Sequence, residues 1–241
     1  MLSFKDRICL ALDVDSTEKA MSLVDATKDS VGMYKVGMQL YTKEGPDIIR
    51  RLKERDLKVF LDLKFHDIPT TVANAAIEAT RLGVDIFNIH ALGGSGMMKK
   101  TIEDVREESV RLGIQRPKVI AVTLLTSINQ DTLGQDLLVN VPIRSYIRYL
   151  ALGAYLCDLD GIVCSPLELK MIQEAIHEDF IYITPGIRPA GSAINDQQRI
   201  TTPQEAINNG ATYIVIGRPI THAQDPESAA ANILHELRNQ Q

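Results

Sequence analysis

Short apolar segments rich in β-branched residues recur at regular intervals along the chain. Segments of four to seven residues that are apolar on both faces are typical of buried strands. The predicted strands are Ile8–Val14, Met33–Val36, Val59–Leu63, Val84–Ile89, Lys118–Leu124, Gly161–Cys164, Phe180–Thr184 and Tyr213–Ile216. No linker or break in composition divides the series, so we expect a single domain over residues 1–241.

Longer segments with the apolar spacing of helices separate these strands. The predicted helices are Thr17–Thr27, Pro46–Arg55, Thr71–Leu82, Met97–Val110, Ile143–Leu152, Glu168–Ile176, Thr202–Asn208 and Pro226–Arg238. Glycines such as Gly83 and Gly113 follow several of them, as expected at helix C-termini. Eight strands alternating with eight helices in 241 residues favour an α/β fold of the TIM (β/α)8 barrel type. A doubly wound open sheet is the alternative.

The most distinctive polar motif follows the third predicted strand. Residues 62–69 read DLKFHDIP, with Asp62 and Lys64 two positions apart. Because side chains alternate along a strand, these two should share one face, about 6–7 Å apart at Cα. Asp67 lies beyond the strand, in a turn that Pro69 helps to close. Charges gathered at a strand end are costly unless they pair or take part in chemistry, so the motif marks a candidate active site.

In barrels of this type the chemistry lies at the C-terminal ends of the strands. The first three predicted strands place Asp13, Lys35, Asp62 and Lys64 there. These four residues are candidates for a chain of alternating acids and bases across the barrel mouth. The alternative is a purely structural network of ion pairs. We disfavour it because buried ion pairs rarely stabilise a fold enough to explain four charges.

The last two predicted strands end in residues suited to an anion. The loops that follow them contain Gly186, Arg188, Gly217 and Arg218. Glycine lets backbone amides approach a phosphate, arginine can bind it through two hydrogen bonds, and barrels often bind phosphate at this position. Residues 191–199 are rich in Gly, Ser, Asn and Asp, and we interpret them as a lid. An ordinary solvated loop is the alternative.

Composition narrows the classes of function. A net charge of −5 and an aromatic content of 5% disfavour a nucleic-acid partner. No apolar run approaches membrane-spanning length, and the N-terminus lacks the pattern of a signal peptide, so we expect a cytoplasmic protein with no membrane partner. Cys9, Cys157 and Cys164 lack metal-site spacing, and we interpret them as buried thiols.

Taken together, the motifs resemble those of the orotidine 5′-phosphate decarboxylases over essentially the full length of the chain. The matching pieces are Leu12-Asp13, Lys35-Val36-Gly37, the motif at 62–69, Asn88-Ile89-His90-Ala91, Leu125-Thr126-Ser127, Thr184-Pro185-Gly186-Ile187-Arg188-Pro189 and Ile216-Gly217-Arg218. The Asp-x-Lys-x-x-Asp core is shared by a wider barrel suprafamily, whereas the extended motif is specific. The resemblance implies a homodimeric lyase that converts orotidine 5′-monophosphate (OMP) to uridine 5′-monophosphate (UMP) and CO2 in pyrimidine biosynthesis. It implies neither a cofactor nor a metal.

The resemblance also implies roles for individual residues. Lys64 would give a proton to C6 of the pyrimidine, and Asp62 would lie beside the substrate carboxylate. Asp67 would come from the other subunit and complete the charged array, with Ile68 and Thr71 beside it. The remaining implied contacts are Asp13 and Lys35 at the ribose, with Lys35 also linked to the array, Thr126 and Ser127 at the pyrimidine, and Pro185, Arg188, Gln197, Gly217 and Arg218 at the phosphate. His66 and His90 receive no catalytic role.

The nearest alternative function lies within the same suprafamily. It is a Mg²⁺-dependent enzyme acting on a sugar phosphate, such as 3-keto-gulonate 6-phosphate decarboxylase or the aldolase hexulose-phosphate synthase. Those enzymes have an acidic metal ligand at the end of strand two, where this chain has Lys35. An ammonium group would repel Mg²⁺, which prefers oxygen ligands. A binding protein that has lost activity has no support, because every charged member of the array is present.

Overall fold

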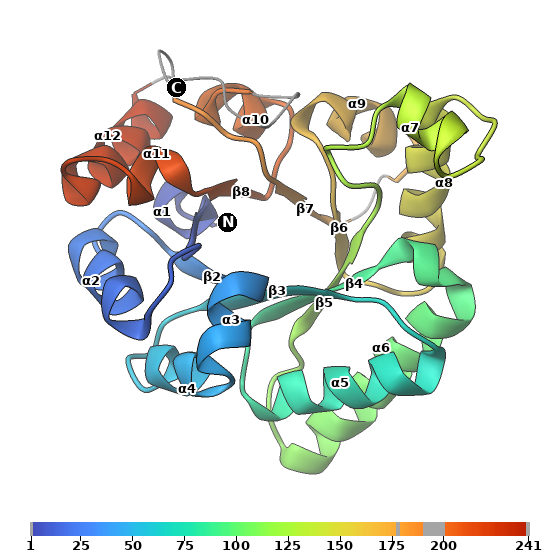
Figure 1. Ribbon diagram of the computed structural model, residues 1–241, viewed down its shortest axis with the longest axis horizontal. Helices are drawn as coiled ribbons and strands as arrows, with labels where there is room; N and C mark the ends of the chain where they lie inside the picture. The colour runs from blue at the N-terminus through green and yellow to red at the C-terminus, as the bar shows by residue number, and fades with distance from the viewer. Residues whose placement is uncertain (1, 177–178, 190–200, 240–241) are drawn as a thin grey trace.

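Eight parallel strands close into a barrel in the computed structural model, and helices surround it (Figure 1). The strands are β1 (Ile8–Ala11), β2 (Met33–Gly37), β3 (Val59–Phe65), β4 (Ile86–His90), β5 (Lys118–Val122), β6 (Gly161–Val163), β7 (Ile181–Thr184) and β8 (Tyr213–Ile216). Each strand pairs with the next, and β8 pairs with β1. The structure describes residues 2–176, 179–189 and 201–239. The TIM barrel is therefore confirmed, and the open sheet is excluded.

Helices and short helical turns connect the strands. They are α1 (Phe4–Arg7), α2 (Thr17–Thr27), α3 (Met38–Glu44), α4 (Asp47–Lys53), α5 (Pro69–Arg81), η1 (Ala91–Gly93), α6 (Gly94–Leu112), α7 (Gln130–Gln135), α8 (Ile143–Leu156), η2 (Pro166–Glu168), α9 (Leu169–Gln173), α10 (Pro203–Asn208), α11 (Arg218–Thr221) and α12 (Pro226–Arg238). Side-chain caps fix several starts: Ser16 accepts a hydrogen bond from the backbone N–H of Lys19, and Thr202 caps α10. The α2 and α12 bounds agree with the sequence prediction.

Some elements differ from the sequence prediction. The short helices α1, α3, α7 and α11 have too few turns for a periodic pattern and were not predicted. Strand β1 ends at Ala11, so Asp13 lies on the loop after the strand and not on the strand itself. Strand β3 continues to Phe65, two residues beyond its predicted end.

Two apolar layers account for the apolar character of both faces of each strand. One fills the barrel interior and comprises Cys9, Met33, Phe60, Ile86, Ile120 and Ile183. The other lies between the sheet and the helices, and includes side chains such as Tyr34, Leu61 and Phe87. Since alternate residues enter alternate layers, the inward positions next along β2, β3 and β4 are polar: Lys35, Asp62 and Asn88. The interior layer thus forms the floor beneath a polar mouth.

Strand β3 becomes irregular where it enters this mouth. Its register with β4 shifts between Leu61 and Phe65. Within this irregular stretch Lys64 has a φ of +53°, a left-handed conformation that costs a non-glycine residue roughly 1–2 kcal/mol. The simple alternation assumed for Asp62 and Lys64 therefore does not hold through Lys64, and another contact must stabilise its backbone.

The structure agrees with two expectations from the sequence: the cysteines are buried thiols, and the described helices are too short or too polar to span a membrane. Cys9, Cys157 and Cys164 are buried free thiols. Burial raises the pKa of Cys9 to about 12, so this thiol stays protonated at neutral pH. Cys164 lies one residue past the end of β6 and not within it. Within the described ranges, no helix combines the length and apolar content needed to cross a bilayer.

Gly161 provides a test of how tightly β6 and β7 pack. A Cβ at this position would lie 2.1 Å from the carbonyl oxygen of Ile181. We expect Gly161→Ala to lower the free energy of unfolding by about 1–3 kcal/mol, because the two strands would have to move apart. Gly153→Ala in α8 is the matched control. Its nearest neighbour, Met98 Cε, would be 3.9 Å away, and the change should raise stability by about 0.5–1 kcal/mol. Urea unfolding followed by circular dichroism measures both, and equal midpoints would contradict this packing.

Candidate active site

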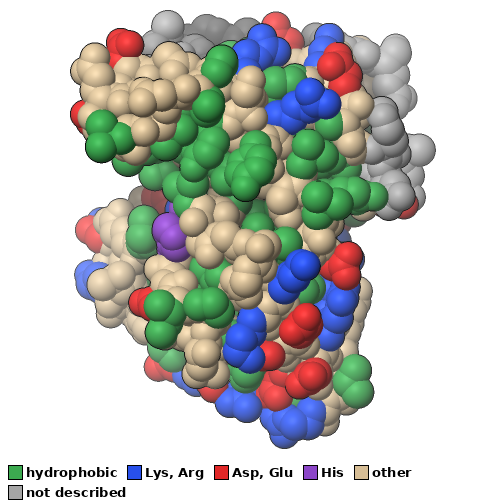
Figure 2. All heavy atoms as spheres, turned by 90° about the vertical axis from the view of Figure 1, so that its right-hand side faces the viewer, with side chains coloured by type: hydrophobic (Ala, Val, Ile, Leu, Met, Phe, Trp, Pro, Cys, Tyr) green, Lys and Arg blue, Asp and Glu red, His purple; other side chains and the backbone are tan. Residues whose placement is uncertain are grey.

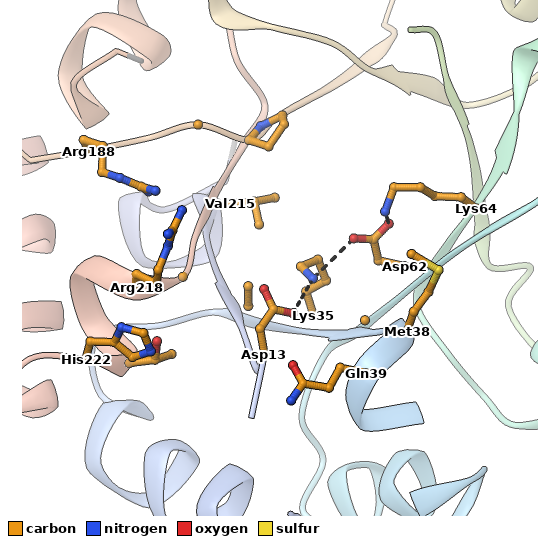
Figure 3. Close-up of a pocket in the computed structure, with 16 residues that line it drawn as sticks. Asp13, Lys35, Met38, Gln39, Asp62, Lys64, Arg188, Val215, Arg218 and His222 are labelled. Atoms are coloured by element: carbon orange, nitrogen blue, oxygen red, sulfur yellow. Dashed lines mark hydrogen bonds and ion pairs between the residues drawn. The ribbon is translucent and has the colours of Figure 1, made fainter. Parts of the chain in front are cut away.

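The carboxyl ends of strands from both halves of the barrel surround a cavity of about 670 Å³, a volume typical of ligand sites. The residues expected from the sequence that line it are Asp13, Lys35, Asp62, Lys64, Pro185, Arg188, Gly217 and Arg218. Figure 3 shows Asp62 and Lys64 on one side of the cavity and the two arginines on the other, with Asp13 and Lys35 between them. The cavity therefore has a charged array at one end and a cationic end opposite it.

The array is a chain of ion pairs that centres on Asp62. One carboxylate oxygen of Asp62 lies 2.6 Å from Lys64 Nζ, and the other lies 3.3 Å from Lys35 Nζ. Lys35 Nζ also lies 3.0 Å from Asp13 Oδ1. The side chains of Lys35 and Asp62 are only 8% and 14% exposed. The order along the mouth is therefore acid, base, acid, base, with the two central charges largely removed from solvent.

Mutual attraction keeps these two buried groups ionised. Burial by itself would lower the pKa of Lys35, but the charges of Asp62 and Asp13 outweigh it and raise that pKa above its usual value. Burial would raise the pKa of Asp62, but Lys35 and Lys64 hold it below its ordinary range. At neutral pH Lys35 is therefore a cation and Asp62 an anion.

A glycine makes room for this close pairing. A Cβ on Gly37, at the end of β2, would lie 2.9 Å from Lys35 Nζ and 3.0 Å from Asp13 Oδ1. Any other residue here would push the two charges apart or displace the strand. The backbone of β2 is thus one wall of the ion-pair chain.

A second cavity, of about 170 Å³, adjoins the first. Its lining is mostly apolar and includes Val122, Leu124, Val163 and Thr126. Five residues line both cavities: Lys35, Asp62, Lys64, Pro185 and Val215. The charged array therefore lies where a polar cavity and an apolar cavity meet.

The cationic end is built from the segments after β7 and β8. Arg188 is buried, and its backbone N–H donates to the carbonyl oxygen of Thr201 over 3.0 Å. The N–H of Thr201 in turn donates to Gly186, whose φ of +81° suits glycine. Arg218 opens α11 directly after β8. Gln197 and the remaining residues of the predicted lid at 191–199 lie outside the described residues.

Four other residues expected at the site do not line either cavity of this chain. Asp67, Ile68, Thr71 and Ser127 are all exposed, with Ile68 at 67%. The Asp67 carboxylate accepts the backbone N–H of Ile68 over 2.6 Å. Within one chain, therefore, the array has four charged members and not five.

Sequence analysis missed several residues that border the array. Met38, Gln39, Thr221 and His222 also line the larger cavity, because α3 and α11 begin directly at its rim. Asn88 contacts both Asp62 and Lys64. The available signal for Asn88 was a polar residue between two apolar neighbours in a strand. Among the described residues, no three His, Cys, Asp or Glu side chains are grouped so as to hold a metal ion.

Similarity to known proteins agrees with this arrangement. A model of the "Orotidine 5'-phosphate decarboxylase / HUMPS family" matches residues 6–233. The chain belongs to this family. The resemblance inferred from the motifs is thereby confirmed, and it extends over nearly the whole barrel.

Family members of known sequence and structure align over almost their full lengths. The orotidine 5′-phosphate decarboxylase of Geotalea daltonii is 48% identical over 231 residues, which are 96% of this chain and 95% of that protein. The decarboxylase of Moorella thermoacetica is 46% identical over 233 residues, covering 97% and 92%. The crystal structure of orotidine 5′-phosphate decarboxylase from Lactobacillus acidophilus matches with a TM-score of 0.84 and 40% identity, covering 96% of this chain and 98% of that one.

A stacked pair of histidines lies beside the array. The rings of His66 and His90 are 5.2 Å apart and inclined by 25°. His90 Nδ1 accepts the backbone N–H of Leu92 over 3.4 Å. Burial, together with the nearby His66 and Lys64, lowers the pKa of His90 to about 4. His90 is therefore neutral at pH 7 and its ring is available for packing.

This pKa predicts a pH dependence of stability. Between pH 6.5 and about 4 the unfolded chain takes up a proton at His90 that the folded chain does not. The free energy of unfolding should therefore fall across this window, by at most about 3 kcal/mol. His90→Asn should flatten this decline, whereas His235→Asn, at an exposed position, should keep the wild-type slope. Urea titrations at half-unit pH steps measure the slopes, and an unchanged slope in His90→Asn would contradict the assignment.

Proposed function

We propose that the protein is an orotidine 5′-phosphate decarboxylase that converts OMP to UMP and CO2 in cytoplasmic pyrimidine biosynthesis, with the whole chain acting as one domain. The observation that carries the proposal is the Asp62–Lys64 pair at the junction of a polar cavity and an apolar cavity. The relatives named orotidine 5′-phosphate decarboxylase support it, since they align over nearly the entire chain.

The shape of the two cavities suggests how OMP binds. The phosphate would lie at the cationic end with Arg188 and Arg218, beside Pro185 and Gly217 and with Gln197 closing over it. The ribose would lie between Asp13 and Lys35. The pyrimidine would enter the apolar cavity, with Thr126 and Ser127 near its polar edge. C6 of the ring would then lie at Lys64.

The reaction needs a group that stabilises negative charge at C6. When the bond between C6 and the carboxylate breaks, its electron pair stays on C6 in the plane of the ring, where resonance cannot delocalise it. CO2 leaves, and the Lys64 ammonium first stabilises the carbanion and then transfers a proton to C6. Asp62 keeps an opposite charge within 2.6 Å of that ammonium. The uncharged amine that remains is reprotonated from solvent.

Repulsion between Asp62 and the substrate carboxylate would add a smaller effect. Two like charges about 4 Å apart cost about 4 kcal/mol at an effective dielectric constant near 20. Enzymes lower barriers by roughly 8–23 kcal/mol, so repulsion alone is too small. Stabilisation of the carbanion must account for most of the acceleration, while the remote phosphate contributes binding energy that assembles the site.

We further propose that the active form is a homodimer. Asp67 is exposed and would enter the site of the other subunit with Ile68 and Thr71. Apolar side chains exposed on segments that follow the strand ends support a partner at this face: Met38, Ile68, Leu92, Leu125 and Leu138. In Figure 2 the surface is hollowed between its upper and lower halves, with hydrophobic side chains and a histidine around the hollow.

The first test measures conversion of OMP in excess EDTA by ultraviolet absorbance, with chromatography to identify UMP. We expect full activity, and we expect Lys64→Ala to lose at least about 10³-fold in kcat because the carbanion loses its cation and its proton donor. Lys99→Ala, which removes an exposed lysine on α6, should retain wild-type turnover.

Two outcomes would overturn the proposal. One is wild-type turnover in Lys64→Ala. The other is a folded wild-type protein that leaves OMP unchanged but acts on a keto-sugar phosphate when Mg²⁺ is added. Lys35 argues against the second outcome, because its ammonium is paired with both Asp13 and Asp62 where a metal would have to bind.

Subunit mixing tests the shared site. Lys64→Ala and Asp67→Ala should each be inactive alone. After exchange, a mixed dimer has one site with both defects and one with neither, so an equimolar mixture should recover about a quarter of wild-type activity. Mixing two separately labelled Lys64→Ala preparations controls for exchange and should recover nothing. Verified exchange without recovery in the first mixture would contradict a site shared between subunits.

A further inference from the structure

Asn88 is an uncharged polar residue at the centre of strand β4. It lies between Phe87 and Ile89, which pack in the outer core, so its own side chain points into the barrel. It is only 1% exposed. A buried amide destabilises the fold unless its donor and its acceptor both form hydrogen bonds. The partners of Asn88 therefore indicate its role.

Both partners belong to the charged array. Asn88 Nδ2 donates to Asp62 Oδ1 over 2.7 Å, and Asn88 Oδ1 accepts the backbone N–H of Lys64 over 2.8 Å. The orientation of the amide is determined by this pair of contacts. In the opposite orientation an oxygen would face the carboxylate and an NH2 group would face the backbone N–H.

The contact with Lys64 occurs where the strand pairing fails. The β3–β4 register shifts between Leu61 and Phe65, and Lys64 adopts a left-handed φ of +53°. In a regular ladder its N–H would donate to the backbone of the neighbouring strand. Here the Asn88 side chain accepts it instead. Lys64, whose left-handed backbone is strained, thus donates its N–H to a side chain that lies 24 positions away in the sequence.

We propose that Asn88 is a positioning residue for decarboxylation: it holds Lys64 in its left-handed conformation and fixes the Asp62 oxygen that receives the Lys64 ammonium. The proposal rests on the function proposed above. The same oxygen, Asp62 Oδ1, accepts both Asn88 Nδ2 and Lys64 Nζ. With this oxygen fixed, Oδ2 faces Lys35 and the tip of Lys64 is directed into the junction of the two cavities. Asn88 itself lines neither cavity, so it acts through its two partners.

Two variants and one control test this role. Asn88→Ala removes both hydrogen bonds. Asn88→Asp keeps the shape and the acceptor for the Lys64 N–H, but it faces Asp62 with a second carboxylate. Thr123→Val is the matched control, because Thr123 is buried just past β5, donates one hydrogen bond to Val163 and lines neither cavity. The measurements are kcat, KM, UMP affinity and hydrogen exchange of the Lys64 backbone amide by NMR.

For Asn88→Ala we expect kcat to fall roughly 10- to 100-fold, the loss that follows from removing one hydrogen bond to a charged group and one to a backbone N–H. KM and UMP affinity should change less than about threefold, because phosphate and ribose contacts remain. Exchange of the Lys64 amide should accelerate at least about tenfold. Thr123→Val should change none of these. A kcat within about threefold of wild type, or an equal loss in Thr123→Val, would overturn the proposal.

Asn88→Asp keeps the test decisive if the alanine variant fails to fold. The Lys64 amide should remain protected, while kcat is low at pH 8 and recovers as the pH falls and the new carboxyl group gains a proton that it can donate to Asp62. A wild-type pH profile would overturn the proposal. Hydrogen exchange needs no substrate, so the role of Asn88 in holding Lys64 can be judged even if the wild-type protein does not convert OMP.

Discussion

A single buried carboxylate organises the mouth of this barrel. Asp62 accepts Lys64 and Asn88 at one oxygen and faces Lys35 at the other. Removing a carboxylate from water costs several kcal/mol, and it is tolerated only where donors and opposite charges replace the solvent. Lys64 lies on the same strand as Asp62, whereas Lys35 and Asn88 come from the neighbouring strands β2 and β4, so Asp62 links three adjacent strands at the barrel mouth.

The closed barrel turns this local arrangement into a directional site. The strands β1, β2 and β3 are consecutive neighbours, so their ends bring the alternating charges together. The segments after β7 and β8 lie across the mouth and carry the two arginines (Figure 3). A substrate that satisfies both sides must carry an anion at one end and its reacting atom at the other. The smaller, mostly apolar cavity adjoins the charged end of this site.

The extent of sequence-based prediction follows from how local each feature is. Strands that are apolar on both faces can be identified from a short stretch of sequence, and so can a motif such as DLKFHDIP. The backbone of Lys64 is different, because its left-handed conformation depends on Asn88 in the next strand. No periodic pattern carries that information. The short helices α3 and α11 were missed for a related reason, since four to seven residues are too few to establish a period.

Gly37 shows how the backbone can limit the movement of charge. Because no side chain separates Lys35 Nζ and Asp13 Oδ1 from the main chain of β2, both groups rest directly against a barrel strand. Strand β2 is hydrogen-bonded to β1 and β3, so its backbone moves less than a side chain would. In the reaction proposed above, charges held in this way would need little rearrangement as negative charge moves from the carboxylate onto the ring, and a preorganised site of this kind differs from water in its small reorganisation energy. The absence of a side chain at Gly37 thus helps to keep the charges of Lys35 and Asp13 in fixed positions.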